Sequence, residues 1–342
     1  MSKVEQLRKD LKQLHTGYGL MSLTWTPTPA PKEKAWGAMQ RVIELAQASG
    51  VKAFFNVGEF YGPDYCNLKL VKSFFDAKPE LRSHVIISCK GGLNIAAFKP
   101  SGKYEDVIAS AENCIKHLGT HLEIFEVARL DKSLGGVYPC ESFEAMASLV
   151  DRGVIDGISL SEVNKDEIAA IHKDWGKYLV CAEVELSMFS TDILYDGTAS
   201  LCNDLGLIIV AYSPLGRGLL TGAIKRDSSF KNGDFRAHIR RFKDDSLQHN
   251  LLLTEFLQRE IVDQRPSSNP ISLPQVALGW IKALNSNEYS NTHIIPIPSG
   301  SDMKKVEENF NDSRTTLTEA EFSKITSFLK EFEVVGGRYE FS

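Results

Sequence analysis

The sequence has few cysteines, no strong excess of either charge and no apolar segment long enough to cross a bilayer. Its six cysteines form neither a Cys-X-X-Cys pair nor a Cys/His cluster, which argues against a zinc site or a disulfide framework and favours a reducing compartment. The formal net charge of −5 provides no basic field that would attract nucleic acid. We therefore expect a protein of the cytoplasm, with the nucleus also open, that binds no metal, nucleic acid or membrane.

A Gly-X-Gly-X-X-Gly fingerprint is also missing, and no linker or low-complexity segment divides the 342 residues. Apolar stretches alternate with segments of helical spacing, and the predicted strands are Gly17–Leu23, Val51–Asn56, Val85–Cys89, His121–Asp131, Ile155–Leu160, Leu179–Leu186, Leu207–Ala211 and His293–Ile297. Eight strand–helix units in a chain of this size predict an α/β fold, a (β/α)8 TIM barrel, as one domain over residues 1–342. A doubly wound sheet is the main alternative, but as a nucleotide binder it would require the missing fingerprint.

Two segments interrupt the regular alternation of strands and helices. A polar loop of residues 212–246 follows the seventh predicted strand, and a loop of this length in a compact domain usually has a function. A further helix is predicted in residues 317–332, beyond the eighth unit. Local signals mark several helix ends, among them Asn164 as an N-cap and Gly206 as a terminator.

A tyrosine and a lysine follow two neighbouring predicted strands. Tyr61 lies in the run GEFYG and Lys90 in the run ISCKGG, each where an apolar stretch gives way to polar or glycine-rich sequence. In a parallel barrel the chemistry is located at these carboxyl ends of the strands. The pair would form a proton donor, because an adjacent cation lowers the pKa of a phenol. Taken alone, a turn aromatic and a solvated loop charge would account for both residues.

Three runs considered together resemble the aldo-keto reductases: FFNVGEFYG with its later lysine, YSPLGRGLLTG, and IIPIPSGSDMKKVEEN. The resemblance extends from about Gly17 to Asn309, with the motifs in the family's order. The combinations GEFYG, FEVARLD, ISLSEV and EVELS are most similar to the fungal pyridoxal reductase branch. The resemblance implies an NADPH-dependent enzyme, a monomer or weak oligomer without a metal, that reduces a small-molecule aldehyde to its primary alcohol. Pyridoxal, reduced to pyridoxine in vitamin B6 metabolism, is the leading candidate substrate.

The family's catalytic set consists of aspartate, tyrosine, lysine and histidine, and this sequence retains only part of it. Tyr61 and Lys90 match the tyrosine and the lysine, whereas Asn56 stands at the aspartate position and Ala128 at the histidine position. Asn56 can still accept a hydrogen bond from Lys90, but it leaves the lysine charge uncompensated. We therefore expect Lys90 to be less firmly held and to lower the pKa of Tyr61 more strongly.

The missing histidine leaves space at Ala128 that a bulky aromatic aldehyde could fill. Side chains alternate along a strand, so Glu126 shares the direction of Ala128 and Arg129 does not. Substrate roles for Glu126 and Arg129 are open at this point, as are structural roles as a buried barrel charge and a rim salt bridge. The residues expected at the mouth of the pocket are Gly19, Trp25 and Phe60.

The resemblance also assigns residues to the dinucleotide NADPH. Tyr212 would stack on the nicotinamide ring, and Ser161 and Glu183 would hold the carboxamide, although an amide side chain is common where Glu183 stands. The residues assigned to the pyrophosphate are Ser213, Pro214, Leu215, Gly216 and Arg217. Those assigned to the adenosine 2′-phosphate and the adenine are Ser299, Ser301, Lys304, Lys305, Glu308 and Asn309. Arginine is common at the position of Lys305, so the lysine forgoes a bidentate phosphate contact.

Two other functions stay open at this point. The missing aspartate and histidine would also suit a barrel that binds NADPH but scarcely turns over and acts as a redox-sensing or regulatory subunit of a partner. An aldolase-type barrel with Lys90 as a Schiff-base nucleophile would leave the nucleotide motifs without a purpose. The retained Tyr61 and Lys90 favour the aldehyde reductase.

Overall fold

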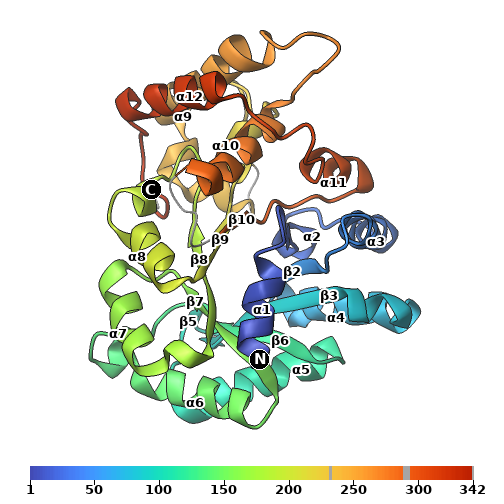
Figure 1. Cartoon of the computed structure of the whole chain (residues 1–342), viewed down its shortest axis with the longest axis vertical. Helices are drawn as coiled ribbons and strands as arrows, with labels where there is room; N and C mark the ends of the chain where they lie inside the picture. The colour runs from blue at the N-terminus through green and yellow to red at the C-terminus, as the bar shows by residue number, and fades with distance from the viewer. Residues whose placement is uncertain (231–232, 288–292, 341–342) are drawn as a thin grey trace.

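Eight parallel strands form one curled sheet surrounded by helices in the computed structural model, which describes residues 1–230, 233–287 and 293–340 (Figure 1). Each strand pairs in parallel with the next one along the chain. Backbone hydrogen bonds join the first strand to the last, because Gly17 donates to Pro296 O at 3.0 Å and Gly19 donates to Pro298 O at 3.2 Å. The predicted (β/α)8 barrel is therefore confirmed.

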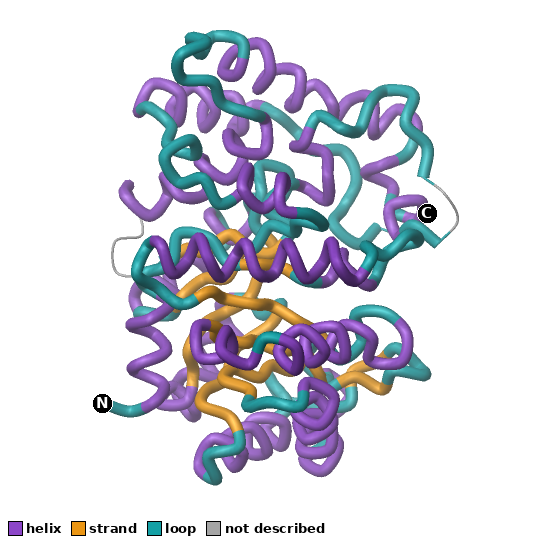
Figure 2. Tube along the Cα trace, turned by 90° about the vertical axis from the view of Figure 1, so that its right-hand side faces the viewer, coloured by secondary structure: helices purple, strands orange, loops and turns teal. Residues whose placement is uncertain are grey.

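The strands of the sheet are β1 (Tyr18–Gly19), β2 (Ala53–Gly58), β3 (Val85–Gly91), β6 (Leu122–Val127), β7 (Ile155–Ser161), β8 (Leu179–Glu185), β9 (Ile208–Tyr212) and β10 (Ile294–Pro296). A separate antiparallel hairpin consists of β4 (Leu93–Asn94) and β5 (Lys99–Pro100). The helices are α1 (Lys3–Leu11), α2 (Met21–Thr24), α3 (Lys32–Ala48), α4 (Cys66–Ala77), α5 (Tyr104–Leu118), α6 (Cys140–Asp151), α7 (Lys165–Trp175), α8 (Thr198–Leu205), α9 (Asp244–Leu257), α10 (Leu273–Asn287), α11 (Met303–Asn309) and α12 (Glu319–Glu331). Figure 2 shows the strands enclosed by these helices. Among the described residues, no helix has both the length and the apolar character needed to span a membrane.

Several element boundaries follow from local signals in the sequence. Asn164 caps α7 by accepting a hydrogen bond from Glu167 N, and the Glu167 side chain accepts from Asn164 N in return. Gly206 ends α8 in the left-handed conformation, at φ 63°. The predicted long loop lies between β9 and α9 as a series of short 3-10 turns, and its residues 231 and 232 are outside the described residues.

The first strand is shorter than predicted. β1 ends at Gly19, Leu20 takes a helical backbone conformation with φ −95° and ψ 0°, and α2 follows. The helical turn buries both Leu20 and Leu23, which an extended strand would send to opposite faces. Position 19 needs a glycine, because a Cβ there would lie 2.8 Å from Ile297 O where the barrel closes.

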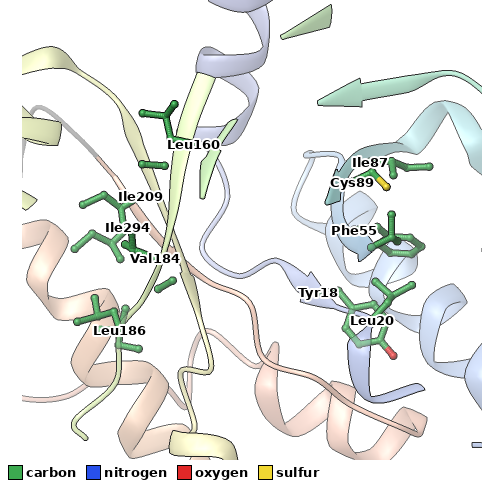
Figure 3. Close-up of a cluster of buried hydrophobic side chains, with 14 of the residues drawn as sticks. Tyr18, Leu20, Phe55, Ile87, Cys89, Leu160, Val184, Leu186, Ile209 and Ile294 are labelled. Atoms are coloured by element: carbon green, nitrogen blue, oxygen red, sulfur yellow. The ribbon is translucent and has the colours of Figure 1, made fainter. Parts of the chain in front are cut away.

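The barrel interior is apolar at the amino end of its strands. Helix α1 lies against that end, where Arg8 Nε donates to Leu179 O at 2.9 Å. The buried side chains that meet there are Val4, Leu7, Leu11, Leu14, Phe54, Ile86, Ile124, Ile208 and Ile295. The outward faces of the strands pack against the helices, as Figure 3 shows for Phe55 and Ile87. Helix α1 therefore closes one end of the barrel and leaves the carboxyl end for polar groups.

Leu11→Ala is expected to lower the free energy of unfolding by about 2–5 kcal/mol, because Leu11 is fully buried and its truncation opens a cavity under the barrel. Urea unfolding of the variant and the wild type measures the difference. Lys9→Ala, on the exposed side of the same helix, is the control and should change stability by no more than about 0.5 kcal/mol. Equal, small effects of the two substitutions would show that α1 does not seal the barrel.

Candidate active site

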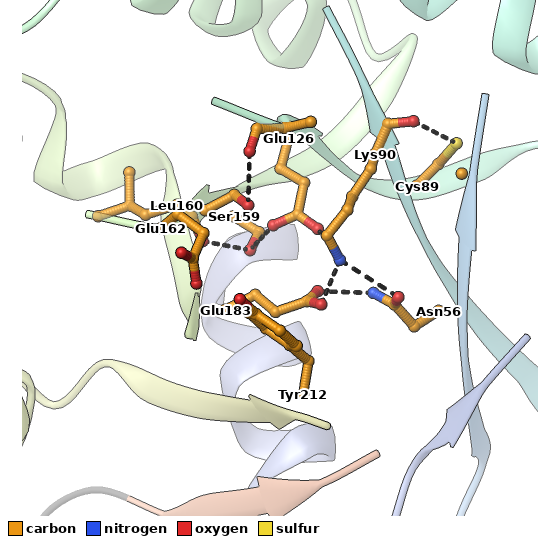
Figure 4. A network of polar contacts seen from close by, with 12 residues as sticks. Asn56, Cys89, Lys90, Glu126, Ser159, Leu160, Glu162, Glu183 and Tyr212 are labelled. Atoms are coloured by element: carbon orange, nitrogen blue, oxygen red, sulfur yellow. Dashed lines mark hydrogen bonds and ion pairs between the residues drawn. The ribbon is translucent and has the colours of Figure 1, made fainter. Parts of the chain in front are cut away.

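Polar side chains from four strands meet inside the barrel near the carboxyl ends of the strands (Figure 4). Asn56 lies on β2, Lys90 on β3, Glu126 on β6 and Glu183 on β8. The register pairs Lys90 with Glu126, and the alternation of side chains turns these residues toward the interior. All four are buried, with exposed fractions between 0% and 6%. The strands thus bring together residues that are far apart in the chain.

Lys90 is the centre of this cluster. Its Nζ lies 3.1 Å from Glu126 Oε1 and 3.3 Å from Asn56 Oδ1, and it forms a second ion pair with Glu183. Asn56 Nδ2 donates to Glu183 Oε2 at 2.6 Å, and Ser159 Oγ donates to Glu126 Oε2 at 2.6 Å. The expectation that Asn56 leaves the lysine charge uncompensated is wrong, because Lys90 forms ion pairs with glutamates from β6 and β8.

The two glutamates determine the charge of the lysine. Burial by itself lowers the pKa of Lys90, but Glu126 and Glu183 outweigh this effect and hold the pKa well above its usual range. Burial, reinforced by Glu126 and opposed by Lys90, raises the pKa of Glu183 to about 8. Lys90 is therefore an ammonium at neutral pH. It contacts Glu183, whose carboxyl group keeps its proton to a higher pH than a free glutamate does.

Tyr61 follows β2 and folds back over its end. A Cβ at position 58 would lie 2.8 Å from the Tyr61 ring, so only glycine permits this approach. The Tyr61 ring centre is 6.0 Å from Lys90 Nζ. Burial raises the pKa of Tyr61, and Lys90 offsets only part of that effect while Glu183 adds to it. The expected net lowering of the Tyr61 pKa is therefore wrong for this structure, because the lysine charge is shared with two glutamates.

Aromatic rings surround Tyr61 at the mouth of the barrel. Trp25 stacks on Tyr61 with ring centres 6.1 Å apart, and Phe60 meets Tyr61 edge-on at 5.2 Å. Phe98, from the tip of the β4–β5 hairpin, packs edge-on against Trp25 and Phe60 at 5.7 and 5.9 Å. Sequence reasoning missed Phe98, for which the only signal was a lone aromatic between a strand and a helix. Trp25 and Phe98 are 42% and 56% exposed, so their rings offer apolar surface to a ligand.

The rim of the barrel next to this mouth is tied together by hydrogen bonds to the backbone. Ala128 O accepts from Ser161 Oγ at 3.1 Å and from Arg129 Nη1 at 2.7 Å. Arg129 also lies 3.9 Å from the carboxylate of Glu162. Arg129 therefore forms the rim salt bridge that the sequence left open, while Glu126 lies deeper, against Lys90.

The C-terminal segment, Val335–Glu340, contacts two residues assigned to the dinucleotide. The Tyr212 hydroxyl is 2.7 Å from the Tyr339 hydroxyl, and Arg217 donates to Arg338 O at 2.6 Å. Sequence reasoning assigned no role to this segment, because the contacting residues are 127 and 121 positions apart and no local pattern links them. The C-terminal segment therefore covers part of the expected dinucleotide site.

The C-terminal segment is anchored at its start by the α9 region. Asn250 accepts from Val335 N at 3.0 Å and donates to Val335 O at 2.9 Å, and Arg241 donates to Gly336 O at 3.1 Å. Arg217 is further tied to Glu185 Oε2 at 2.8 Å. Arg217 therefore has protein partners in this structure, which a bound pyrophosphate would share or replace.

The other residues assigned to the dinucleotide lie in two places. The turn after β9 contains Ser213, Pro214, Leu215 and Gly216. The segment after β10 contains Ser299, Ser301, Lys304, Lys305, Glu308 and Asn309. In that segment Asn309 Nδ2 donates to Ser299 O at 3.1 Å and Lys305 Nζ donates to Ser301 Oγ at 3.0 Å. Lys304 and Lys305 are exposed, so both cations are accessible to an anion.

A barrel with a buried lysine and a tyrosine at the carboxyl ends of its strands has the architecture of a (β/α)8 enzyme. The chain belongs to the aldo/keto reductase family, because the model of that family matches residues 16–330. It is therefore an oxidoreductase, of a family whose members generally use NADH or NADPH.

Curated relatives agree with this assignment, and solved structures agree with the fold. The chain is 55% identical over 341 residues to a Saccharomyces cerevisiae protein named "Putative pyridoxal reductase", covering 98% of this chain and 99% of the relative. It is 30% identical to "Probable pyridoxal reductase 2" of Schizosaccharomyces pombe, covering 94% and 93%. Two solved structures share the fold. A glycerol dehydrogenase from Gluconobacter oxydans has a TM-score of 0.73 at 17% identity, covering 96% of this chain and 95% of the other. A thermostable aldo-keto reductase with the inhibitor epalrestat has a TM-score of 0.64 at 20% identity, covering 92% of this chain and 94% of the other.

Glu183→Gln is expected to flatten the decline of stability between pH 4.5 and about 8. A carboxyl group whose pKa rises on folding from 4.5 to about 8 binds more protons in the folded state, so it lowers the free energy of unfolding as the pH increases through that range. Urea unfolding at a series of pH values measures the slope, with the exposed Glu112→Gln as the control. Parallel curves for wild type and Glu183→Gln would contradict the raised pKa.

Proposed function

We propose that the protein reduces an aldehyde to a primary alcohol with NADPH, and that pyridoxal, which becomes pyridoxine in vitamin B6 metabolism, is its substrate. The observation that carries the proposal is Tyr61 at the carboxyl end of β2, beside a Lys90 that is held as an ammonium. The names of the relatives at 55% and 30% identity support pyridoxal as the substrate.

In this mechanism Tyr61 donates its proton to the carbonyl oxygen of the aldehyde. NADPH, when bound, would supply the hydride to the carbonyl carbon. Lys90 stabilises the phenolate that the proton transfer leaves, because an ammonium in a buried site acts through a low effective dielectric. Glu126 and Glu183 hold Lys90 in place, so its position does not depend on the substrate.

The residues present fit a phosphorylated dinucleotide. Lys304 and Lys305 are exposed cations after β10 and would hold the adenosine 2′-phosphate, which favours NADPH over NADH. Tyr212 ends β9 next to the polar cluster, where its ring would orient the nicotinamide. Arg217 would meet the pyrophosphate by exchanging its bond to the backbone of Arg338.

The mouth of the barrel fits a planar aromatic aldehyde. The rings of Trp25, Phe60 and Phe98 pack edge-on against one another beside Tyr61. Aromatic side chains arranged in this way can bury the faces of an aromatic substrate ring. An aromatic ring would therefore be held by apolar contacts while its carbonyl reaches Tyr61.

A regulatory barrel with little turnover is the second candidate function. The raised pKa of Tyr61 and the protein partners of Arg217 favour it, because both oppose catalysis or cofactor entry. It predicts tight NADPH binding without oxidation of the nucleotide.

Tyr61→Phe is expected to lower kcat/KM for pyridoxal reduction by about 10²–10⁴-fold, because it removes the proton donor and keeps the ring. The assay is NADPH oxidation with pyridoxal, repeated with NADH and with a panel of other aldehydes. Tyr195→Phe, at a tyrosine that is 68% exposed, is the matched control and should retain wild-type rates.

The outcomes separate the two candidates. Loss of activity in Tyr61→Phe with unchanged NADPH affinity supports the reductase. Equal rates in the wild type and Tyr61→Phe would exclude Tyr61 as the proton donor. Tight NADPH binding with negligible turnover across the whole panel would replace the reductase with the regulatory subunit.

A further inference from the structure

Two buried carboxyl groups face a single ammonium inside the barrel. Lys90 Nζ pairs with Glu126 Oε1 at 3.1 Å and also with Glu183. If both carboxyl groups were ionised, one negative charge would have no cation of its own. Glu126 and Glu183 are 0% and 1% exposed, so water does not solvate such a charge.

Both carboxyl groups meet at one atom, because Glu126 Oε1 and Glu183 Oε1 each pair with Lys90 Nζ. Two ionised carboxylates beside one ammonium would repel each other in surroundings without water. Two carboxyl groups that share one buried site retain one proton between them, because like charges held close together cannot both ionise. The geometry therefore accounts for one carboxylate and one carboxylic acid.

Neutral hydrogen-bond donors hold both glutamates. Ser159 donates to Glu126 at 2.6 Å and Asn56 donates to Glu183 at 2.6 Å, so each carboxyl group has one neutral donor. Each also contacts Lys90. Two carboxyl groups that interact at the same ammonium titrate as a unit rather than as two separate groups.

We infer that Glu126 and Glu183 share a single proton and together act as one singly charged counter-ion of Lys90. Both are then positioning residues for Tyr61, a consequence that rests on the proposed function. The titratable groups that act on the pair are Lys90 from β3, Tyr61 from the loop after β2 and Cys181 from β8. Loss of the shared proton in alkaline solution adds a second negative charge beside Lys90 and makes Tyr61 a weaker acid.

Infrared spectroscopy of the protein without substrate tests the shared proton directly. The wild type at pH 7 should show the carbonyl stretch of a buried protonated carboxyl group, and this band should vanish as the pH rises through about 8. Either Glu126→Gln or Glu183→Gln should remove it at pH 7, because the remaining glutamate then ionises against Lys90. Loss of the infrared band in each of the two single variants is the result that a shared proton predicts.

Glu59→Gln is the matched control for this measurement. Glu59 is also buried with a raised pKa, but its partners are Ser110 and Asn113 rather than a second carboxyl group. This substitution should leave the band that disappears in the Glu126 and Glu183 variants. A band that survives in one of those two variants at pH 7, or that neither variant affects, would overturn the shared proton.

The pH dependence of aldehyde reduction tests the consequence for Tyr61. In the wild type kcat/KM should fall above about pH 8, and this fall should be absent in both single variants, in which no second carboxyl group remains to ionise. A fall that persists in both variants would contradict the positioning role. Absence of aldehyde reduction by the wild type at every pH would refute the proposed function and leave the infrared result standing.

A variant with both glutamines provides the rescue experiment. It leaves the Lys90 ammonium without a carboxylate and should lose more activity than the product of the two single losses. Adding Asn56→Asp returns one carboxylate within reach of Lys90, since Asn56 Oδ1 is 3.3 Å from Nζ, and should restore the activity of the single variants. Additive losses without rescue would show that the glutamates act separately.

Discussion

The burial of the Lys90 ammonium is the constraint on which the rest of the site depends. Removing an ion of this kind from water costs several kcal/mol even after the protein relaxes, and only opposite charge at contact distance offsets the cost. Glu126 supplies that charge from the adjacent strand, whereas Glu183 lies 93 positions from Lys90 in the chain. The contact between Lys90 and Glu183 forms only when the barrel is closed, so the fold and the charge cluster depend on each other.

Burial also determines the acidity of Tyr61. Exclusion of water raises the pKa of Tyr61, and the lysine lowers it by less than burial raises it. Tyr61 therefore keeps its proton at neutral pH and above, and remains available as a donor. A weak acid of this kind gives up its proton only when charge develops on the acceptor, so under the proposed function Tyr61 would donate its proton as the hydride reaches the carbonyl carbon.

Much of the fold was predictable, because strands and helices depend on local patterns. The ends of α7 and α8 were marked by Asn164 and Gly206, and the eight strands by their apolar runs. Tyr61 and Lys90 were found from the strand ends that carry them. The partners of Lys90 were not predicted, since they meet it across the barrel interior. Phe98 and the C-terminal segment were missed for the same reason, because tertiary contacts bring them to the site.

The loss of the family's aspartate has a different meaning once the partners of Lys90 are known. The resemblance places an acid on β2 and an amide on β8, whereas this chain has Asn56 on β2 and Glu183 on β8. The two side chains are hydrogen-bonded to each other at 2.6 Å and both contact Lys90. An exchange of acid and amide between these bonded neighbours keeps one carboxyl group and one amide at the lysine, and Glu126 adds a second carboxyl group. Asn56 is therefore no evidence for a barrel that has lost its chemistry, and the argument for a regulatory subunit rests on Ala128, on the protein partners of Arg217 and on the raised pKa of Tyr61.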